Sequence, residues 1–194
     1  GIRKGMALRR ALRLCRDARV ATPRPDRYEQ AMHDVLKQVL PYSPLIERGE
    51  RDGHVFIDVT GTGRLFGPPA DIAWRLRRDI RAGLGLDPIW ALAANKLVAK
   101  VATRLVKPAG EYIVEAGDEA AFLAPLSLVL IPGLEREDLE RFAGFNLSRV
   151  GEVLNWRLDH LEVVFGRRAG LIYEATRGAD PSPVLPVGAK PPVV

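Results

Sequence analysis

The sequence predicts an α/β (α+β) fold, in which a mixed sheet with packed helices is followed by a small all-helical region. Three observations support this prediction. Short apolar runs typical of strands alternate with segments of helical periodicity up to about residue 116. From Asp118 onward the pattern is helical and its segments are shorter. Beyond residue 180 the chain is rich in proline, which is typical of an extended linker.

The first 40 residues are predicted to be mainly helical. Residues 4–15 have a basic amphipathic pattern, and residues 18–22 could form a short strand before a Pro-Arg-Pro turn. Asp26 is a suitable cap for a helix that runs to about Leu40 and is stopped by Pro41.

The middle of the chain carries the predicted sheet. Residues 47–60 suggest two strands joined by a tight turn at 51–53. A long helix follows at residues 69–84, where apolar side chains line one face and arginines the other. Two more strands are expected at residues 88–92 and 112–115. This order of elements gives a mixed sheet with helices packed on it.

The helix between the last two strands carries a row of basic residues. Lys96, Lys100 and Arg104 are spaced i, i+4, i+8, and Lys107 continues the row. No acidic residue occurs from residue 88 to residue 110. A basic row at the end of a strand is suited to holding phosphates. By spacing alone, however, such a row is more often an ordinary solvated lysine face.

Composition limits the classes of protein. A chain of 194 residues, 47% of them hydrophobic, can hold one domain or two small ones. The formal net charge of +5 favours a polyanionic partner, and residues 1–27 hold nine of the 29 Lys and Arg residues. A single cysteine, Cys15, excludes a disulfide framework, and the three histidines lack metal-ligand spacing. Because no apolar run has membrane-spanning length, we expect a cytoplasmic protein.

Four ordered motifs resemble those of the Y-family translesion DNA polymerases, the UmuC and DinB type. Asn95-Lys-x-x-Ala-Lys-x-Ala102 with Lys107-Pro-x-Gly110 is similar to the palm signature of that family. The other matches, in chain order, are residues 5–15 to the end of the fingers, residues 43–47 and 56–67 to the strand with the acidic pair, and residues 122–133 to the entry of the thumb.

The resemblance implies a domain organisation. Residues 1–17 correspond to a fingers remnant (a basic helix), residues 18–116 to a palm-like domain, residues 117–179 to a helical thumb-like domain and residues 180–194 to a proline-rich linker. In family members such a linker leads to the little finger, which grips DNA. The chain is therefore expected to be a fragment or a truncated product.

The resemblance also implies where catalytic acids would stand. Two-metal nucleotidyl transfer needs paired carboxylates, and in the family an Asp-Glu pair precedes the strand that matches Phe56-Ile-Asp58. Alignment without a gap places Gly53 and His54 there, and one inserted residue brings only Asp52 into register. Asp52 is thus the one catalytic candidate. No metal ligand or cofactor is predicted for this chain, and Mg²⁺ is implied only for an active, longer parent. A lone strand histidine is more often structural than metal-binding.

The segment around Pro132, Gly133 and Leu134 resembles a helix-hairpin-helix. In that motif backbone N–H groups of the turn meet a DNA phosphate. The second glycine of the family is replaced by Glu135, whose side chain and charge oppose a phosphate. A DNA-binding hairpin and a packing-only hairpin of two helices are equally supported. The resemblance separately implies a nucleotide triphosphate contact for Lys107.

The leading hypothesis is a non-catalytic Y-family homologue that binds primer–template DNA in translesion DNA repair, as in the accessory branch of the family that lacks the catalytic acids. The alternative is a divergent active polymerase, a nucleotidyltransferase represented here by a fragment. A third hypothesis is a basic, partner-binding domain without a nucleic-acid role. For a full-length protein the resemblance implies a part in the SOS response and partners in replication or mutagenesis complexes, including the sliding clamp. No membrane partner is expected.

Overall fold

The structure is a computed structural model that describes residues 1–3, 5–49 and 53–189. It divides into two compact units, Gly1–His33 and Asp34–Val194, and each is described by itself. The first unit holds α1 (Leu8–Leu14) and the start of α2 (Pro25–Val39), and none of its described residues is buried.

Two sequence expectations for the first unit need correction. The basic helix begins at Leu8, not at residue 4, because Gly5 has a φ of 82°, outside the helical region. The prediction of a short strand at residues 18–22 is wrong, because this segment is irregular in the structure. Val20 is 61% exposed, so the segment lacks the buried face that would favour pairing with another strand.

An antiparallel strand pair opens the second unit. β1 (Ile46–Arg48) and β2 (Val55–Ile57) pair in a register that sets Ile46 opposite Ile57. The short α3 (Gly63–Phe66) and the long α4 (Pro69–Leu84) follow, and α4 has the bounds that the sequence predicts. Pro69 starts α4 with a preset φ, and Gly85 ends it at a φ of 66°. The core between this sheet, α4 and the end of α2 contains Leu36, Val39, Ile46, Ile72 and Leu76.

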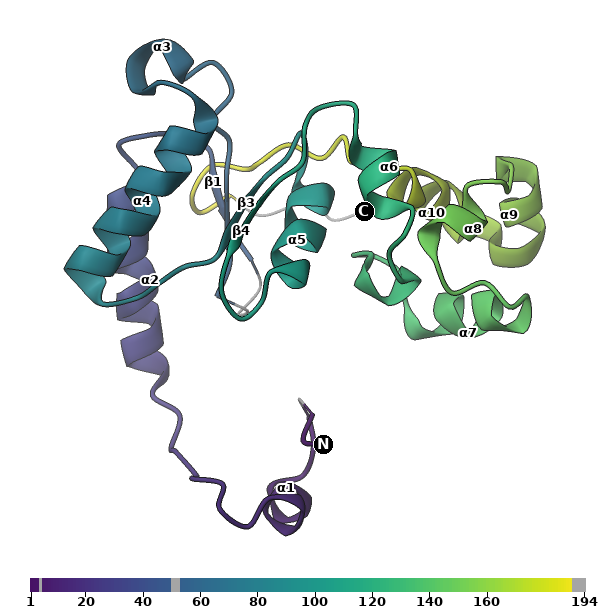
Figure 1. Cartoon of the computed structure of the whole chain (residues 1–194), viewed down its shortest axis with the longest axis horizontal. Helices are drawn as coiled ribbons and strands as arrows, with labels where there is room; N and C mark the ends of the chain where they lie inside the picture. Colours follow the sequence, from purple (N-terminus) through teal and green to yellow (C-terminus); the bar gives the residue numbers. More distant parts are fainter. Residues whose placement is uncertain (4, 50–52, 190–194) are drawn as a thin grey trace. The chain divides into compact units, whose positions relative to one another are not determined.

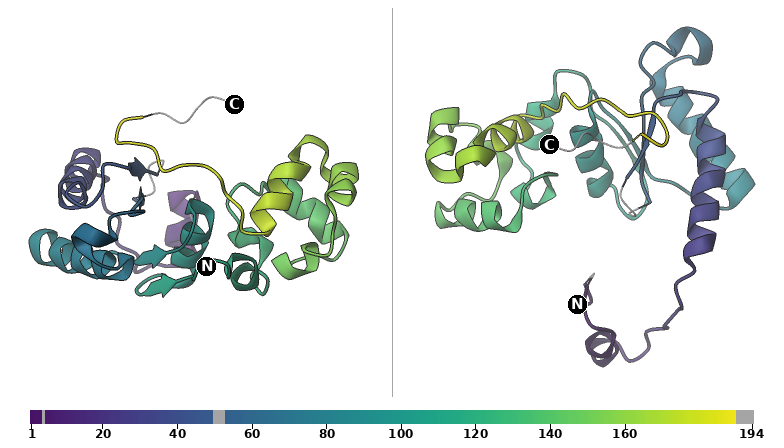
Figure 2. Two further views of the ribbon diagram at one scale, coloured as in Figure 1. Left: turned by 90° about the horizontal axis from the view of Figure 1, so that it is seen from above. Right: turned by 180° about the vertical axis from the view of Figure 1, so that it is seen from behind.

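A parallel strand pair carries the predicted basic helix. β3 (Trp90–Leu92) and β4 (Glu111–Ile113) pair in parallel, and α5 (Lys96–Leu105) is the crossover that a parallel pair requires. In the described ranges the antiparallel and parallel pairs form two separate two-stranded sheets, which corrects the prediction of a single mixed sheet. Figures 1 and 2 show α5 lying alongside β3 and β4.

Residues 119–176 of the second unit are mainly helical, as predicted. The elements of this region are α6 (Glu119–Leu123), η1 (Leu128–Leu130), α7 (Arg136–Gly144), α8 (Val150–Val153), α9 (Leu158–Phe165), η2 (Gly166–Arg168) and α10 (Ala169–Thr176). They share one core with the apolar face of α5, where Val98 and Val101 are fully buried. Phe142 and Phe165 meet in this core with ring centroids 4.6 Å apart. Among the described helices, none has the length and apolarity to cross a bilayer.

Candidate nucleic-acid interface

The N-terminus of α5 is fixed by Asn95. Its Oδ1 accepts the Val98 N–H at 2.9 Å, which satisfies one of the donors that a helix start leaves open. Its Nδ2 donates to the Gly178 carbonyl at 2.7 Å, on a segment 83 residues further along the chain. One asparagine therefore starts the helix and holds the chain that follows α10.

The side chain of Lys96 is largely shielded from solvent, and its ammonium group is surrounded by polar atoms. Its ammonium group donates to Glu47 Oε2 at 2.8 Å, to Glu47 Oε1 at 3.1 Å and to the Pro183 carbonyl at 2.8 Å. The Lys96 side chain is only 15% exposed, and that of Glu47 on β1 is 24% exposed. The first residue of the predicted basic row is thus paired with a carboxylate from another strand.

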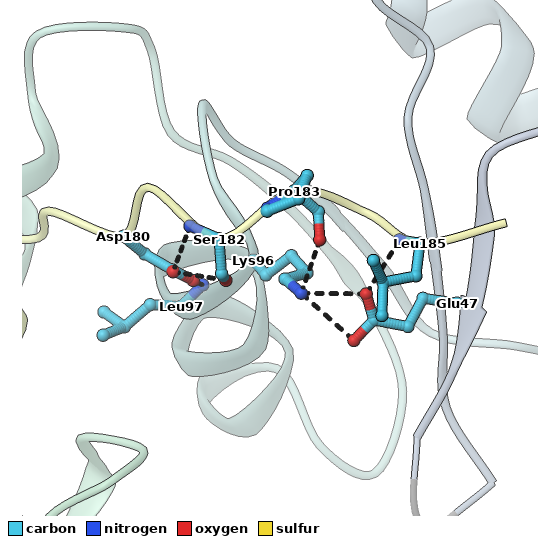
Figure 3. Close-up of polar contacts among 7 residues, drawn as sticks. All are labelled: Glu47, Lys96, Leu97, Asp180, Ser182, Pro183 and Leu185. Carbon is cyan, nitrogen blue, oxygen red and sulfur yellow. Dashed lines mark hydrogen bonds and ion pairs between the residues drawn. The ribbon is translucent and has the colours of Figure 1, made fainter. Parts of the chain in front are cut away.

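The segment Gly178–Leu185, which we call the strap, lies across α5 and β1 (Figure 3). The Asp180 carboxylate accepts the Leu97 N–H at 3.1 Å, at the positive end of the helix dipole. The Leu185 N–H donates to Glu47 Oε2 at 3.0 Å. From Asp180 onward the strap belongs to the predicted proline-rich linker, and in the structure it is hydrogen-bonded to the sheet and helix beneath it.

The other residues of the basic row have different surroundings. Lys100 is half-buried and lines a groove beside Lys96. Arg104 donates to the Leu130 carbonyl and so joins α5 to the end of η1, just before the hairpin. Lys107 lies beyond the end of α5 and is exposed. The four residues therefore do not form one uniform solvated ridge.

A groove brings two of the predicted motifs together. It has a volume of about 530 Å³ and is lined by Lys96 and Lys100 from α5 and by Pro132 and Gly133 from the hairpin. Leu134, the third hairpin residue of the prediction, is half-buried and packs against the core. Three carboxylates also line the groove and outnumber the two lysines: Glu47, Glu174 and Asp180.

The hairpin turn is held from within the chain by Arg168. The guanidinium donates to the Gly133 carbonyl at 2.7 Å, to Glu135 Oε1 at 2.8 Å and to Asp138 Oδ2 at 2.6 Å. Asp138 is 3% exposed and also accepts the Glu135 N–H at 2.8 Å, as in a capping box at the start of α7. Glu135 is therefore part of an ion-pair network that stabilises the turn.

This network predicts a loss of stability in acid. Burial raises the pKa of Asp138, but hydrogen bonds from Arg168 and from the Glu135 N–H outweigh it, so the pKa lies below its ordinary 3.8. A carboxyl with a lowered folded-state pKa contributes stability above its unfolded pKa and loses that contribution as pH falls through the folded value. We expect the urea concentration at the midpoint of unfolding to decrease when the pH is lowered below about 4. The fall should be smaller in Asp138→Asn, and equal falls in both proteins would contradict the prediction.

The ungapped alignment assigns the positions of the family's acidic pair to Gly53 and His54. Gly53 has a φ of 74°, which favours glycine over a residue with a side chain. The His54 ring lies over Gly49, where a Cβ would come within 2.1 Å of it, and packs edge-on against Phe56 at 4.9 Å. The Asp58 carboxylate accepts the Thr60 N–H at 2.8 Å, which is a turn role. Asp52 lies outside the described residues.

The described residues do not fit a pair of Mg²⁺ ions at this place. Magnesium prefers oxygen ligands from carboxylates, and Glu47 is already bound to Lys96 while Asp58 caps a turn. Over residues 1–3, 5–49 and 53–189, no group of three or more His, Cys, Asp or Glu side chains could hold a metal ion.

Sequence reasoning missed the residues that contact the predicted ones. Glu47 stands 49 positions before Lys96, and Arg168 stands 30 positions after Asp138. No local spacing signals either pair. The contact of Asp180, in contrast, is predictable from the sequence, since an acidic residue at the start of a proline-rich segment is a suitable partner for an open helix N-terminus.

The fold matches that of the palm and thumb domains of Y-family DNA polymerases. The chain belongs to the impB/mucB/samB family, whose family model matches residues 1–104. It is 34% identical over 189 residues to DNA polymerase IV of Desulfatibacillum aliphaticivorans, which covers 97% of this chain and 48% of that protein. DNA polymerase IV of Halorhodospira halophila is 33% identical, over 96% of this chain and 52% of that protein. The chain thus spans about half the length of these curated relatives.

Solved structures confirm the predicted fold class. The crystal structure of DinB from Sulfolobus solfataricus matches with a TM-score of 0.80 at 20% identity, over 95% of this chain and 54% of that chain. An insertion ternary complex of Dbh DNA polymerase matches with a TM-score of 0.78 at 20% identity, over 93% and 54% of the two chains.

Proposed function

We propose that this chain is the palm and thumb of a Y-family protein that binds primer–template DNA in translesion synthesis without catalysing nucleotide transfer. Its place in the family and its relatives named DNA polymerase IV support a role in translesion synthesis. We further propose a cytoplasmic protein of the SOS response, with the sliding clamp or mutagenesis-complex proteins as partners of the full-length form.

The observation that carries the non-catalytic role is the turn at Gly53 and His54. In the ungapped alignment, a glycine at positive φ and a histidine whose ring lies over Gly49 take the positions of the acidic pair, and one inserted residue would bring only Asp52 into register. Neither the glycine nor the histidine supplies the carboxylate that a two-metal mechanism needs. The nearby Glu47 carboxylate is neutralised by Lys96 at 2.8 Å.

DNA binding is supported by the groove. Lys96 and Lys100 stand beside the Pro132-Gly133 turn, so side-chain ammonium groups and a hairpin face one space. Contacts to DNA phosphates contribute to the affinity for DNA but do not depend on its base sequence. The same fold occurs in an insertion ternary complex of Dbh DNA polymerase, which is consistent with this use of the groove.

The alternative function is an active translesion polymerase whose remaining acids lie elsewhere in a longer protein. The identity of 34% with a DNA polymerase IV over 97% of this chain favours it. Such an enzyme would use Asp52 and Mg²⁺, and the two functions differ in whether paired carboxylates are available.

We expect no primer extension by the purified chain at any concentration of Mg²⁺ or Mn²⁺. The reason is the absence of an acidic pair at positions 53 and 54. Incorporation of dNTPs on a labelled primer–template is the measurement. The matched control is Asp52→Ala: template-dependent incorporation that Asp52→Ala abolishes would establish the active polymerase.

We expect Lys100→Ala and Lys107→Ala to differ in a binding assay. If Lys100 contacts a DNA phosphate, its replacement should reduce the slope of log affinity against log salt by somewhat under one unit. If Lys107 contacts a nucleotide triphosphate, Lys107→Ala should weaken dNTP binding and leave the DNA slope unchanged. Fluorescence anisotropy with labelled DNA and with a labelled dNTP measures both. Unchanged values in both assays would favour the basic domain without a nucleic-acid role.

A further inference from the structure

Among the described residues, four hydrogen bonds join the strap to the elements beneath it. In order, Gly178 contacts Asn95, Asp180 contacts the Leu97 N–H, Pro183 contacts Lys96, and Leu185 contacts Glu47. The separations in sequence are 83, 83, 87 and 138 residues, so none of these contacts is local. Both members of the Glu47–Lys96 ion pair are also partners of the strap.

The contacts use all the hydrogen-bonding capacity of Lys96. An ammonium group has three protons, and here they meet Glu47 Oε1, Glu47 Oε2 and the Pro183 carbonyl. A phosphate could bind Lys96 only by displacing one of these acceptors. The Pro183 carbonyl is the neutral acceptor and belongs to a segment without secondary structure, so it is the one that an anion displaces at lowest cost.

The strap also places negative charge beside the groove. Asp180 and Pro181 line the groove together with Lys96 and Lys100. The Asp180 carboxylate occupies the N-terminal end of α5, where it repels a phosphate that approaches the two lysines.

We propose that the strap is an autoinhibitory element whose docking and polyanion binding at Lys96 are mutually exclusive. This inference rests on the proposed DNA-binding function of the groove. With the strap docked, Lys96 is saturated and shielded. When the strap lifts, one ammonium proton becomes available, the exposure of Lys96 rises and the Asp180 charge leaves the groove. DNA then binds the open form only.

A single substitution can release the strap without touching the groove lysines. Leu185→Pro removes the N–H that donates to Glu47, in a segment that is already rich in proline. Leu185→Ala keeps that N–H and removes only the side chain, so it separates the hydrogen bond from packing. Val187→Pro is the matched control, because Val187 follows Pro186 at the start of a turn closed by the Ala189 N–H, a position that favours proline.

The experiment combines affinity and hydrogen exchange on the whole chain. We expect the Leu185→Pro chain to bind a labelled primer–template duplex at low salt about fivefold more tightly than the unmodified chain does. This factor corresponds to a strap that is docked in roughly four-fifths of the unmodified molecules, because only the remaining molecules can bind DNA. Leu185→Ala and Val187→Pro should bind like the unmodified chain. In the unmodified chain, added DNA should accelerate exchange of the Leu97 and Leu185 amides.

The outcomes separate the strap from the proposed function. If DNA binds and Lys100→Ala weakens it, but Leu185→Pro has unchanged affinity, the autoinhibitory role is overturned and the DNA-binding role stands. Slower amide exchange at Leu185 on adding DNA would also overturn it, because DNA and strap would then bind together. If no variant binds DNA, the proposed function fails and the strap's role fails with it.

Discussion

Replacing Arg168 with methionine should lower the free energy of unfolding by about 2 kcal/mol, on the scale of breaking a partly buried ion pair. The guanidinium contacts Gly133, Glu135 and Asp138, and the Asp138 carboxylate is 3% exposed. Without Arg168 that carboxylate keeps the Glu135 N–H but loses its counter-charge. Urea denaturation followed by circular dichroism measures the change.

Arg167→Met is the matched control for Arg168→Met. Arg167 has the same side chain one position earlier and is exposed, so its replacement should change stability by less than about 0.5 kcal/mol. The double variant Asp138→Asn with Arg168→Met should be less destabilised than the sum of the single variants, because each removes the same pair. Equal effects of Arg167→Met and Arg168→Met would show that the network does not stabilise the hairpin.

Phe142→Ala should have the largest effect, a loss of about 4 kcal/mol, since it leaves a cavity in a closed core. Phe142 has no exposed surface and packs against Phe165 at 4.6 Å between ring centroids. It lies on α7 in the core that also contains the apolar face of α5. The same denaturation experiment measures the loss.

Phe145 offers a control of identical chemistry. It lies three positions later, is 51% exposed and contacts Trp156 edge-on at 5.2 Å. Phe145→Ala removes one exposed aromatic contact, so we expect a loss of about 1 kcal/mol. A loss as large as that of Phe142→Ala would mean that burial does not govern stability in this helical region.

The sequence predicts long, strongly periodic elements best. The helix at Pro69–Leu84 has the predicted bounds because its apolar stripe is flanked by a proline at its start and a glycine after its end. The prediction of a strand at residues 18–22 is wrong because strand formation depends on a partner strand, which no local sequence pattern reveals. The strands at Ile46–Arg48 and Val55–Ile57 are shorter than the two strands that the sequence predicts within residues 47–60.

The predicted site is more difficult to derive from sequence than the fold. The spacing of Lys96 and Lys100 correctly places both on one face, since they line one groove. It cannot reveal that Glu47, on β1, neutralises Lys96. For the same reason the sequence indicates only that the charge of Glu135 opposes a phosphate. It cannot reveal the ion pair of Glu135 with Arg168, which lies 33 residues away.

The strap has a consequence for how the molecule folds. Its contacts close loops of 83 to 138 residues, and the entropy of closing such loops is repaid only when both ends are already ordered. The strap should therefore dock last, on a sheet and helix that are formed without it, and open first, as the least stable cooperative part of this unit. During synthesis, Lys96 and Glu47 would thus remain exposed to solvent until residues 178–185, which form the strap, have been made.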